Sequence, residues 1–137
     1  MESISISLEA EGYLEYGRDP KAFTHVTYMY TCGANYKHVN DVQIQGVIRP
    51  EVFAHLDSVL FDGECFLPRQ LGLPALSPEP FGEGYDDEVD HSLHTVELVS
   101  WGLKKEGVKM AAVDAKAFTE KVMAVTREAD WDFVNYG

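Results

Sequence analysis

The chain has few basic residues, few cysteines and no long apolar run, and each shortage excludes a class of protein. Its 137 residues contain 11 Lys and Arg against 23 Asp and Glu, which gives a formal net charge of -12 at pH 7. A surface of this sign repels nucleic-acid phosphates and anionic lipid headgroups. We therefore expect no direct binding of nucleic acid or membranes.

The cysteine content and the N-terminus indicate a compartment. Cys32 and Cys65 are the two cysteines, and they form no C-x-x-C pair. Two thiols are too few for a disulfide framework and suit a reducing environment. Residues 1–8 lack the pattern of a secretory signal, and no apolar run reaches the roughly 18 residues of a membrane-spanning helix. The sequence predicts a cytoplasmic protein.

The motifs of several enzyme classes are also missing. The chain has no G-x-S-x-G elbow, no G-x-x-x-x-G-K-[ST] phosphate loop and no G-x-G-x-x-G fingerprint, since Gly82 and Gly84 are not followed by a third glycine. A Cys–His pair formed by residues distant in sequence stays open. The sequence therefore favours a non-enzymatic role without excluding an enzyme.

What the sequence does contain is enough apolar residues for one domain. Hydrophobic residues make up 45% of the chain, and a chain of this length can bury a core without a metal or disulfide. Alternating apolar residues predict strands over residues 4–8, 23–32 and 42–48, and a further strand over 95–101. A turn at 104–107 leads to a partner strand over 108–113. The competing prediction for 96–103 is a helix.

Two helices have clear start signals. Pro50 suits the first helical position and Gly63 suits a stop, which predicts a helix over residues 50–61. Asp114 can cap a second helix, whose apolar face comprises Phe118, Val122, Val125 and Ala129. Strands and helices in this order predict an α+β fold, a single two-layer domain over residues 1–137 with a mainly antiparallel sheet and two helices packed on one face.

The negative charge is concentrated in the middle of the chain. Residues 51–100 hold 11 acidic side chains and one basic one, Arg69. Part of this stretch, about residues 68–90, is a Gly/Pro-rich acidic loop. Carboxylates gathered on one face would speed association with a cationic partner. We therefore expect an inhibitor, immunity-like or adaptor protein that binds a basic protein, or the basic surface of a nucleic-acid-binding protein, through Glu79, Glu83, Asp86, Asp87, Glu88 and Asp90.

A divalent metal site is the alternative, and without it we expect no cofactor. Its ligands would be Asp90, His91, His94 and Glu97, in a metal-binding domain or a small metal-dependent enzyme. The two histidines would share a face on a helix but point to opposite faces on a strand. An EF-hand template over residues 86–97 fails, because His91 stands where the loop needs glycine.

Tyrosines are concentrated in the first third of the chain. Five of the seven tyrosines, Tyr28 and Tyr30 among them, lie in the first third, where few lysines accompany them. Without a basic groove, strand tyrosines favour a core or a protein interface over base stacking. The apolar tail from Trp131 to Gly137 is predicted to pack onto the domain or to form a homodimer contact.

Overall fold

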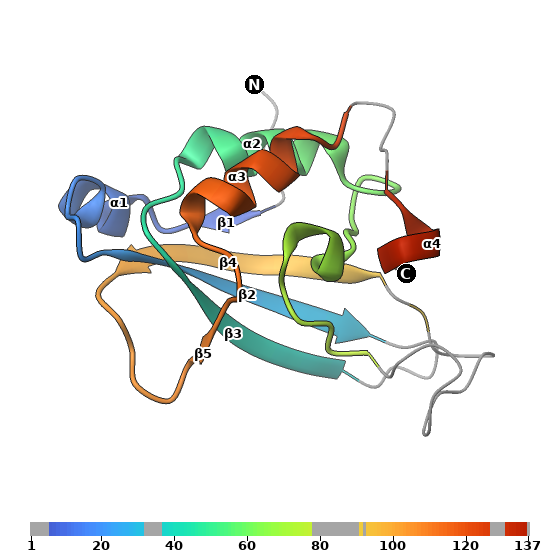
Figure 1. Ribbon diagram of the computed structural model, residues 1–137, viewed down its shortest axis with the longest axis horizontal. Helices are drawn as coiled ribbons and strands as arrows, with labels where there is room; N and C mark the ends of the chain where they lie inside the picture. The colour runs from blue at the N-terminus through green and yellow to red at the C-terminus, as the bar shows by residue number, and fades with distance from the viewer. Residues whose placement is uncertain (1–5, 32–36, 78–90, 92, 127–130, 137) are drawn as a thin grey trace.

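A five-stranded sheet forms the centre of the computed structural model, which describes residues 6–31, 37–77, 91, 93–126 and 131–136. The strands lie in the order β1-β4-β2-β3-β5 (Figure 1). Their bounds are β1 Ser7–Leu8, β2 Phe23–Thr31, β3 Lys37–Gln45, β4 His94–Gly102 and β5 Lys109–Met110. With the helices described below, this arrangement is the α+β fold that the sequence predicts.

The three long strands pair in antiparallel fashion. β2 lies between β3 and β4 and pairs with both along most of its length. Val26, Tyr28 and Tyr30 share one face of β2, as the alternating pattern predicts, and all three are buried. The predicted strand over 95–101 is confirmed as β4, and the competing helix over 96–103 is wrong.

The short edge strands make the sheet mixed, which corrects the prediction of a mainly antiparallel one. β1 runs parallel to β4, and β5 runs parallel to β3. The predicted strand over 108–113 is reduced to β5 and does not turn back onto β4. The reason is a long-range contact: the Gln43 side chain bonds to the backbone of Lys105 and Val108 and holds the connection against β3.

A bulge in β4 changes which residues face the core. Thr27 of β2 lies opposite Leu98 and Tyr28 lies opposite Val96, so Glu97 is left as the extra residue. Such an insertion shifts the alternation of faces by one position. Val96 is buried on the near side of the bulge, and Val99 and Trp101 on the far side. Strict alternation along residues 95–101 therefore does not hold.

Two helices lie side by side over one face of the sheet (Figure 1). They are α2 (Pro50–Val59) and α3 (Ala115–Met123). Phe53 of α2 contacts both the sheet and α3, with its ring 6.2 Å from that of Trp101 and 5.9 Å from that of Phe118. The Asp114 carboxylate caps α3 by accepting the Ala117 N–H at 2.9 Å, as predicted.

A third helix, α1 (Ala10–Tyr16), was not predicted, because Gly12 indicates a turn. The glycine has a packing reason instead. A Cβ atom at this position would lie 2.6 Å from the Trp101 carbonyl oxygen, so only glycine lets α1 approach β4. The Tyr13 ring then packs edge-on against Trp101 with 5.2 Å between centroids.

The remaining segments return to the core. η1, a 3-10 helix over Pro68–Leu71, begins the predicted loop. Just before it, Cys65 and Phe66 form isolated bridges with Phe61 and His94. The C-terminal tail also returns to the core. Trp131 is buried and donates its indole N–H to the Val59 carbonyl at 2.8 Å, so the tail packs onto the domain here. α4 (Phe133–Tyr136) follows, and Ala129 lies outside the described residues. No helix in the described ranges is long and apolar enough to cross a bilayer.

Candidate functional site

Histidine and tyrosine side chains gather at the end of the sheet where β2 finishes and where β3 and β4 begin. The strand register sets Tyr30 directly opposite His38 of β3 and His94 of β4. His91, just before β4, places its ring against Tyr30 from a third direction, with 5.0 Å between centroids. We call Tyr28, Tyr30, His38, His91 and His94 the His–Tyr cluster.

Inside the cluster, two buried side chains hold the segment that follows η1. His94 is 1% exposed, and its Nε2 accepts the Leu76 N–H at 2.9 Å. The Tyr28 hydroxyl donates to the Pro74 carbonyl. Burial raises the pKa of Tyr28, so its hydroxyl stays protonated and keeps this role. The chain leading into residue 78 is thereby fixed to the sheet.

His91 fixes the other flank of the acidic stretch. Its Nδ1 accepts the Leu93 N–H at 3.0 Å, which leaves the Nε2 hydrogen to donate to the Thr31 carbonyl at 2.7 Å. The His91 backbone N–H donates to the Tyr30 hydroxyl at 3.2 Å. Both flanks of residues 78–90 are therefore attached to the same cluster.

The predicted acidic face itself lies outside the described residues. This applies to Glu79, Glu83, Asp86, Asp87, Glu88 and Asp90. Nine of the 23 acidic side chains and one of the 11 basic ones fall outside the described ranges, so a charge of -8 out of -12 belongs there. Between described residues there is one ion pair, Arg49–Glu51 at 3.9 Å, and it is largely exposed.

The described members of the predicted metal set are occupied by protein groups. His91 and His94 use ring nitrogens for backbone contacts, and the Glu97 carboxylate accepts the Thr95 hydroxyl at 2.9 Å. Within the described ranges, no group of three or more His, Cys, Asp or Glu side chains is placed to hold a metal ion. Asp90 lies outside these ranges, so the metal alternative stays a prediction.

The environment of Cys65 does not favour a nucleophilic thiol. Burial raises the pKa of the Cys65 thiol, and the neighbouring Glu64 and Asp62 carboxylates raise it further. A thiol with a raised pKa is a poor nucleophile at neutral pH. Cys32 lies outside the described residues.

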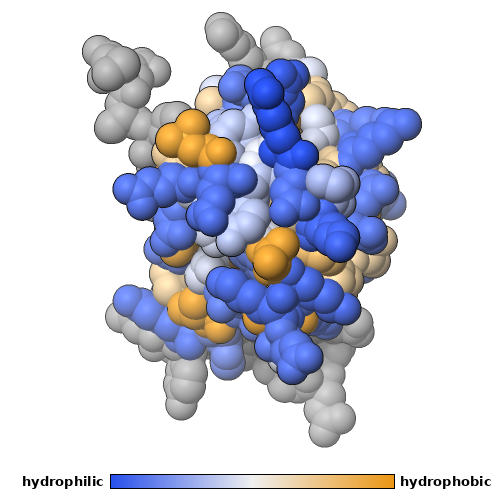
Figure 2. Space-filling model, turned by 90° about the vertical axis from the view of Figure 1, so that its left-hand side faces the viewer, coloured by the Kyte–Doolittle hydropathy of each residue, from blue (hydrophilic) through white to orange (hydrophobic). Residues whose placement is uncertain are grey.

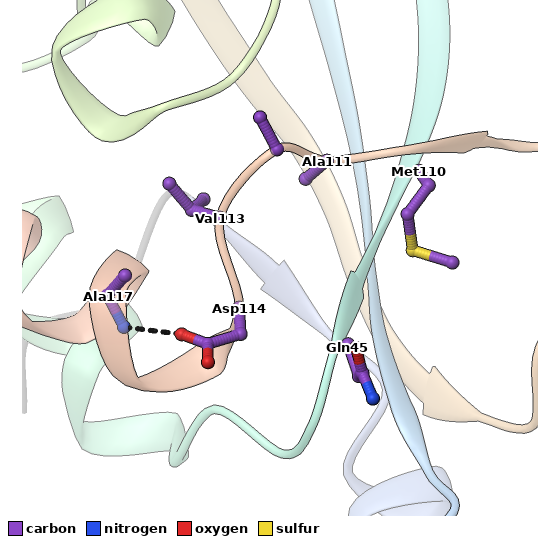
Figure 3. Close-up of a pocket in the computed structure, with 7 residues that line it drawn as sticks. Gln45, Met110, Ala111, Val113, Asp114 and Ala117 are labelled. Carbon is purple, nitrogen blue, oxygen red and sulfur yellow. Dashed lines mark hydrogen bonds between the residues drawn. The ribbon is translucent and has the colours of Figure 1, made fainter.

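A shallow pocket of about 360 Å³ lies between β3, β5 and α3 (Figure 3). Its walls are mostly small and apolar, and its charged group is Asp114. That carboxylate bonds to the Ala117 N–H, as Figure 3 shows. The pocket therefore offers little for recognising a charged ligand, and we assign it no chemistry.

Two buried polar residues near the other end of the sheet escaped the sequence interpretation. Gln43 is 1% exposed and makes the three bonds to the 105–108 backbone. The Nε2 of His25 lies 3.1 Å from the Leu103 carbonyl oxygen, and its buried Nδ1 has no hydrogen-bond partner among the residues that the structure describes. Both side chains hold the β4–β5 connection, and only contacts distant in sequence reveal this role.

The end of the molecule that carries α1 lies away from the His–Tyr cluster and has its own acidic residues. Figure 2 shows this end as largely hydrophilic, with hydrophobic residues in separate groups. Four carboxylates, Glu9, Glu11, Glu15 and Asp19, belong to α1 and its flanks. They provide a second set of acidic residues for comparison with residues 79–90.

Comparison with known proteins gives no further guide, because no protein family, curated protein or solved structure matches this chain.

Proposed function

We propose that the chain is a binding protein that engages a basic macromolecule through the carboxylates of residues 79–90. The observation that carries this proposal is the position of the charge. Six acidic residues and no basic ones occupy residues 79–90, and both flanks of this stretch are tied to the His–Tyr cluster. The described residues are close to balanced in charge by comparison.

The His–Tyr cluster supports a scaffold role. Three of its side chains bond to main-chain atoms, those of Tyr28, His91 and His94. These bonds fix the points at which the acidic stretch leaves and rejoins the described structure. A high local density of negative charge would also steer a cationic partner and speed its association.

The expected partner is a basic protein, or the basic surface of a nucleic-acid-binding protein, and not nucleic acid itself. An inhibitor, immunity-like or adaptor role fits such a surface. The same proposal places the chain in the cytoplasm and treats the sheet with α2 and α3 as one two-layer domain.

The test is the association rate with fluorescent poly-L-lysine, measured by stopped flow at low ionic strength. One variant neutralises Asp86, Asp87, Glu88 and Asp90 to Asn or Gln. The matched control neutralises Glu9, Glu11, Glu15 and Asp19 in the same way, so that both variants have the same net charge. Because steering depends on local charge, we expect the first variant to associate about tenfold more slowly than wild type.

The control variant should associate much closer to the wild-type rate. Equal slowing in both variants would show that net charge alone matters and would contradict the proposed site. An unchanged rate in the first variant would contradict it as well.

A further inference from the structure

Among the described residues, the outer edge of β3 is paired only near its C-terminal half. β5 pairs only with Val42 and Gln43, so no described residue pairs with the outer side of residues 37–41. All five of these residues are exposed, and Val39 is 60% exposed. We call residues 37–41 the free edge. An exposed strand edge of this kind is a template for pairing with another strand.

The hydrogen bonds of Gln43 and Gly46 show which backbone N–H and C=O groups of the free edge point outward. The Gln43 carbonyl accepts the Ala111 N–H at 2.9 Å on the β5 side, whereas the Gly46 N–H donates to the Ala22 carbonyl on the β2 side. Because the N–H and C=O of one residue point the same way and alternate along a strand, the outward groups are those of Lys37, Val39 and Asp41.

We propose that the free edge pairs with the same edge of a second copy of this chain, antiparallel and centred on Val39. In this register Val39 faces Val39 of the second copy, and Lys37 faces Asp41 of the second copy. Both members of each pair present outward N–H and C=O groups, so every outward backbone group of the free edge finds a partner. A shift by one residue would oppose outward groups with inward ones.

Charge complementarity argues for a second copy. The sequence Lys37-His38-Val39-Asn40-Asp41 has opposite charges at its two ends, so the two-fold register forms the Lys37–Asp41 pair twice. Directly opposed charges of opposite sign stabilise a strand pair. Two copies of a chain with a net charge of -12 repel each other overall. The free edge is a place where their charges instead attract.

The side chains on the face away from α2 and α3 are arranged for this contact. Lys37, Val39 and Asp41 share that face, and Met29 lies opposite Val39 on β2. The Thr27 hydroxyl donates to Asp41 Oδ1 at 2.6 Å, which orients the carboxylate and leaves its second oxygen for Lys37 of the second copy.

One local bond must open for the pair to form. In the single chain the outward Asp41 N–H donates to the Asn40 side-chain oxygen at 3.0 Å. Replacing that bond by a strand-to-strand bond requires only a side-chain rotation at an exposed residue. Since five residues bury little surface, the dimer should be weak and dependent on concentration.

The test uses charge reversal and analytical ultracentrifugation over a concentration series. Lys37→Asp and Asp41→Lys each place like charges opposite each other, so each variant should weaken self-association about tenfold. The double variant K37D/D41K restores opposite pairs and should recover the wild-type constant. An equimolar mixture of the two single variants should form a mixed dimer, because all opposed pairs are again of opposite sign.

The controls separate register from net charge and from folding. Lys21→Asp changes the net charge as Lys37→Asp does, but it lies outside the free edge and should have little effect. Val39→Pro removes an outward N–H that β2 does not use, so the fold should persist while the dimer is lost. Circular dichroism of each variant verifies the fold.

Several outcomes would overturn the proposal. A monomer at all concentrations would show that the free edge does not pair with a second copy. Failure of both the double variant and the mixture to restore the dimer would exclude this register. Loss of the dimer in Val134→Asp, with the edge variants unaffected, would assign it to the C-terminal tail. Binding of extended peptides without self-association would assign the edge to another partner.

Discussion

At the scale of single residues, polar side chains in this protein substitute for missing main-chain partners. His91 and His94 hold the two flanks of residues 78–90, and Gln43 holds the connection between β4 and β5. A buried backbone group without a partner is costly, so each of these side chains stabilises a segment that the sheet cannot pair. The histidines therefore serve the fold at the positions where the sequence suggested a metal.

Replacing Gln43 tests this role. Gln43→Leu keeps the size of the side chain but removes the bonds to Lys105 and Val108, so we expect a loss of about 2 kcal/mol in the free energy of unfolding. The matched control is Gln45→Leu on the same strand, which is exposed and should change stability by less than about 0.5 kcal/mol. Urea unfolding of both variants measures the difference, and equal stabilities would contradict the assigned role.

His25 predicts a dependence of stability on pH. Burial lowers its pKa below 6.5 and nearby Lys105 lowers it further, while the Leu103 carbonyl and Asp41 act in the opposite direction. Since the unfolded chain then binds a proton more readily, stability is full above the unfolded pKa and falls as the pH drops toward the folded pKa.

The comparison is between wild type and His25→Gln, by urea unfolding at about pH 7.5 and about pH 5.5. The glutamine amide can still donate to Leu103 but does not titrate in this range. Wild type should lose more stability on acidification than the variant does. An identical loss in both proteins would show that His25 does not cause the dependence.

The sequence predicts some of these residues and not others, for a physical reason. Alternation along β2 places Tyr28 and Tyr30 on one face, because that pattern is local, and the structure shows that this face is buried. Gln43 and Gln45 look alike in the sequence, yet only Gln43 is buried. Its partner Lys105 is 62 residues away, so no local pattern could distinguish the two.

At the scale of elements, local signals predicted the helices that have them. Pro50 and Asp114 mark the starts of α2 and α3 as expected. α2 ends at Val59, before the predicted Phe61, and a turn with positive φ at Asp62 and Gly63 follows. The position of α1 and the pairing of β5 were missed, because both depend on contacts with distant strands.

The close approach of α1 to β4 can be tested at Gly12. In an isolated helix, alanine would stabilise this position by about 1 kcal/mol relative to glycine. Here its Cβ would collide with the Trp101 carbonyl, so Gly12→Ala should lower stability by about 1–3 kcal/mol. Thermal unfolding gives the sign directly. A more stable variant would mean that α1 does not pack on β4 as described.

At the scale of the whole molecule, charge and structure are separated along the chain. The described residues build the sheet, its helices and the attachments at both flanks of residues 78–90. Most of the excess negative charge lies outside the described ranges, and six of its carboxylates lie in residues 79–90. Composition alone predicted this concentration, because charge counting needs no structure. The anchoring by the His–Tyr cluster required the three-dimensional register.

The most direct measurement is a map of backbone amide chemical shifts during a titration with poly-L-lysine, repeated at low and high ionic strength. If the carboxylates of residues 79–90 form the binding surface, the largest shifts at low ionic strength should fall in residues 79–90 and at His91 and Leu93. They should decrease when salt screens the charges. Shifts of similar size around Glu9, Glu11 and Glu15 of the α1 region, or none in residues 79–90, would contradict the proposed binding site.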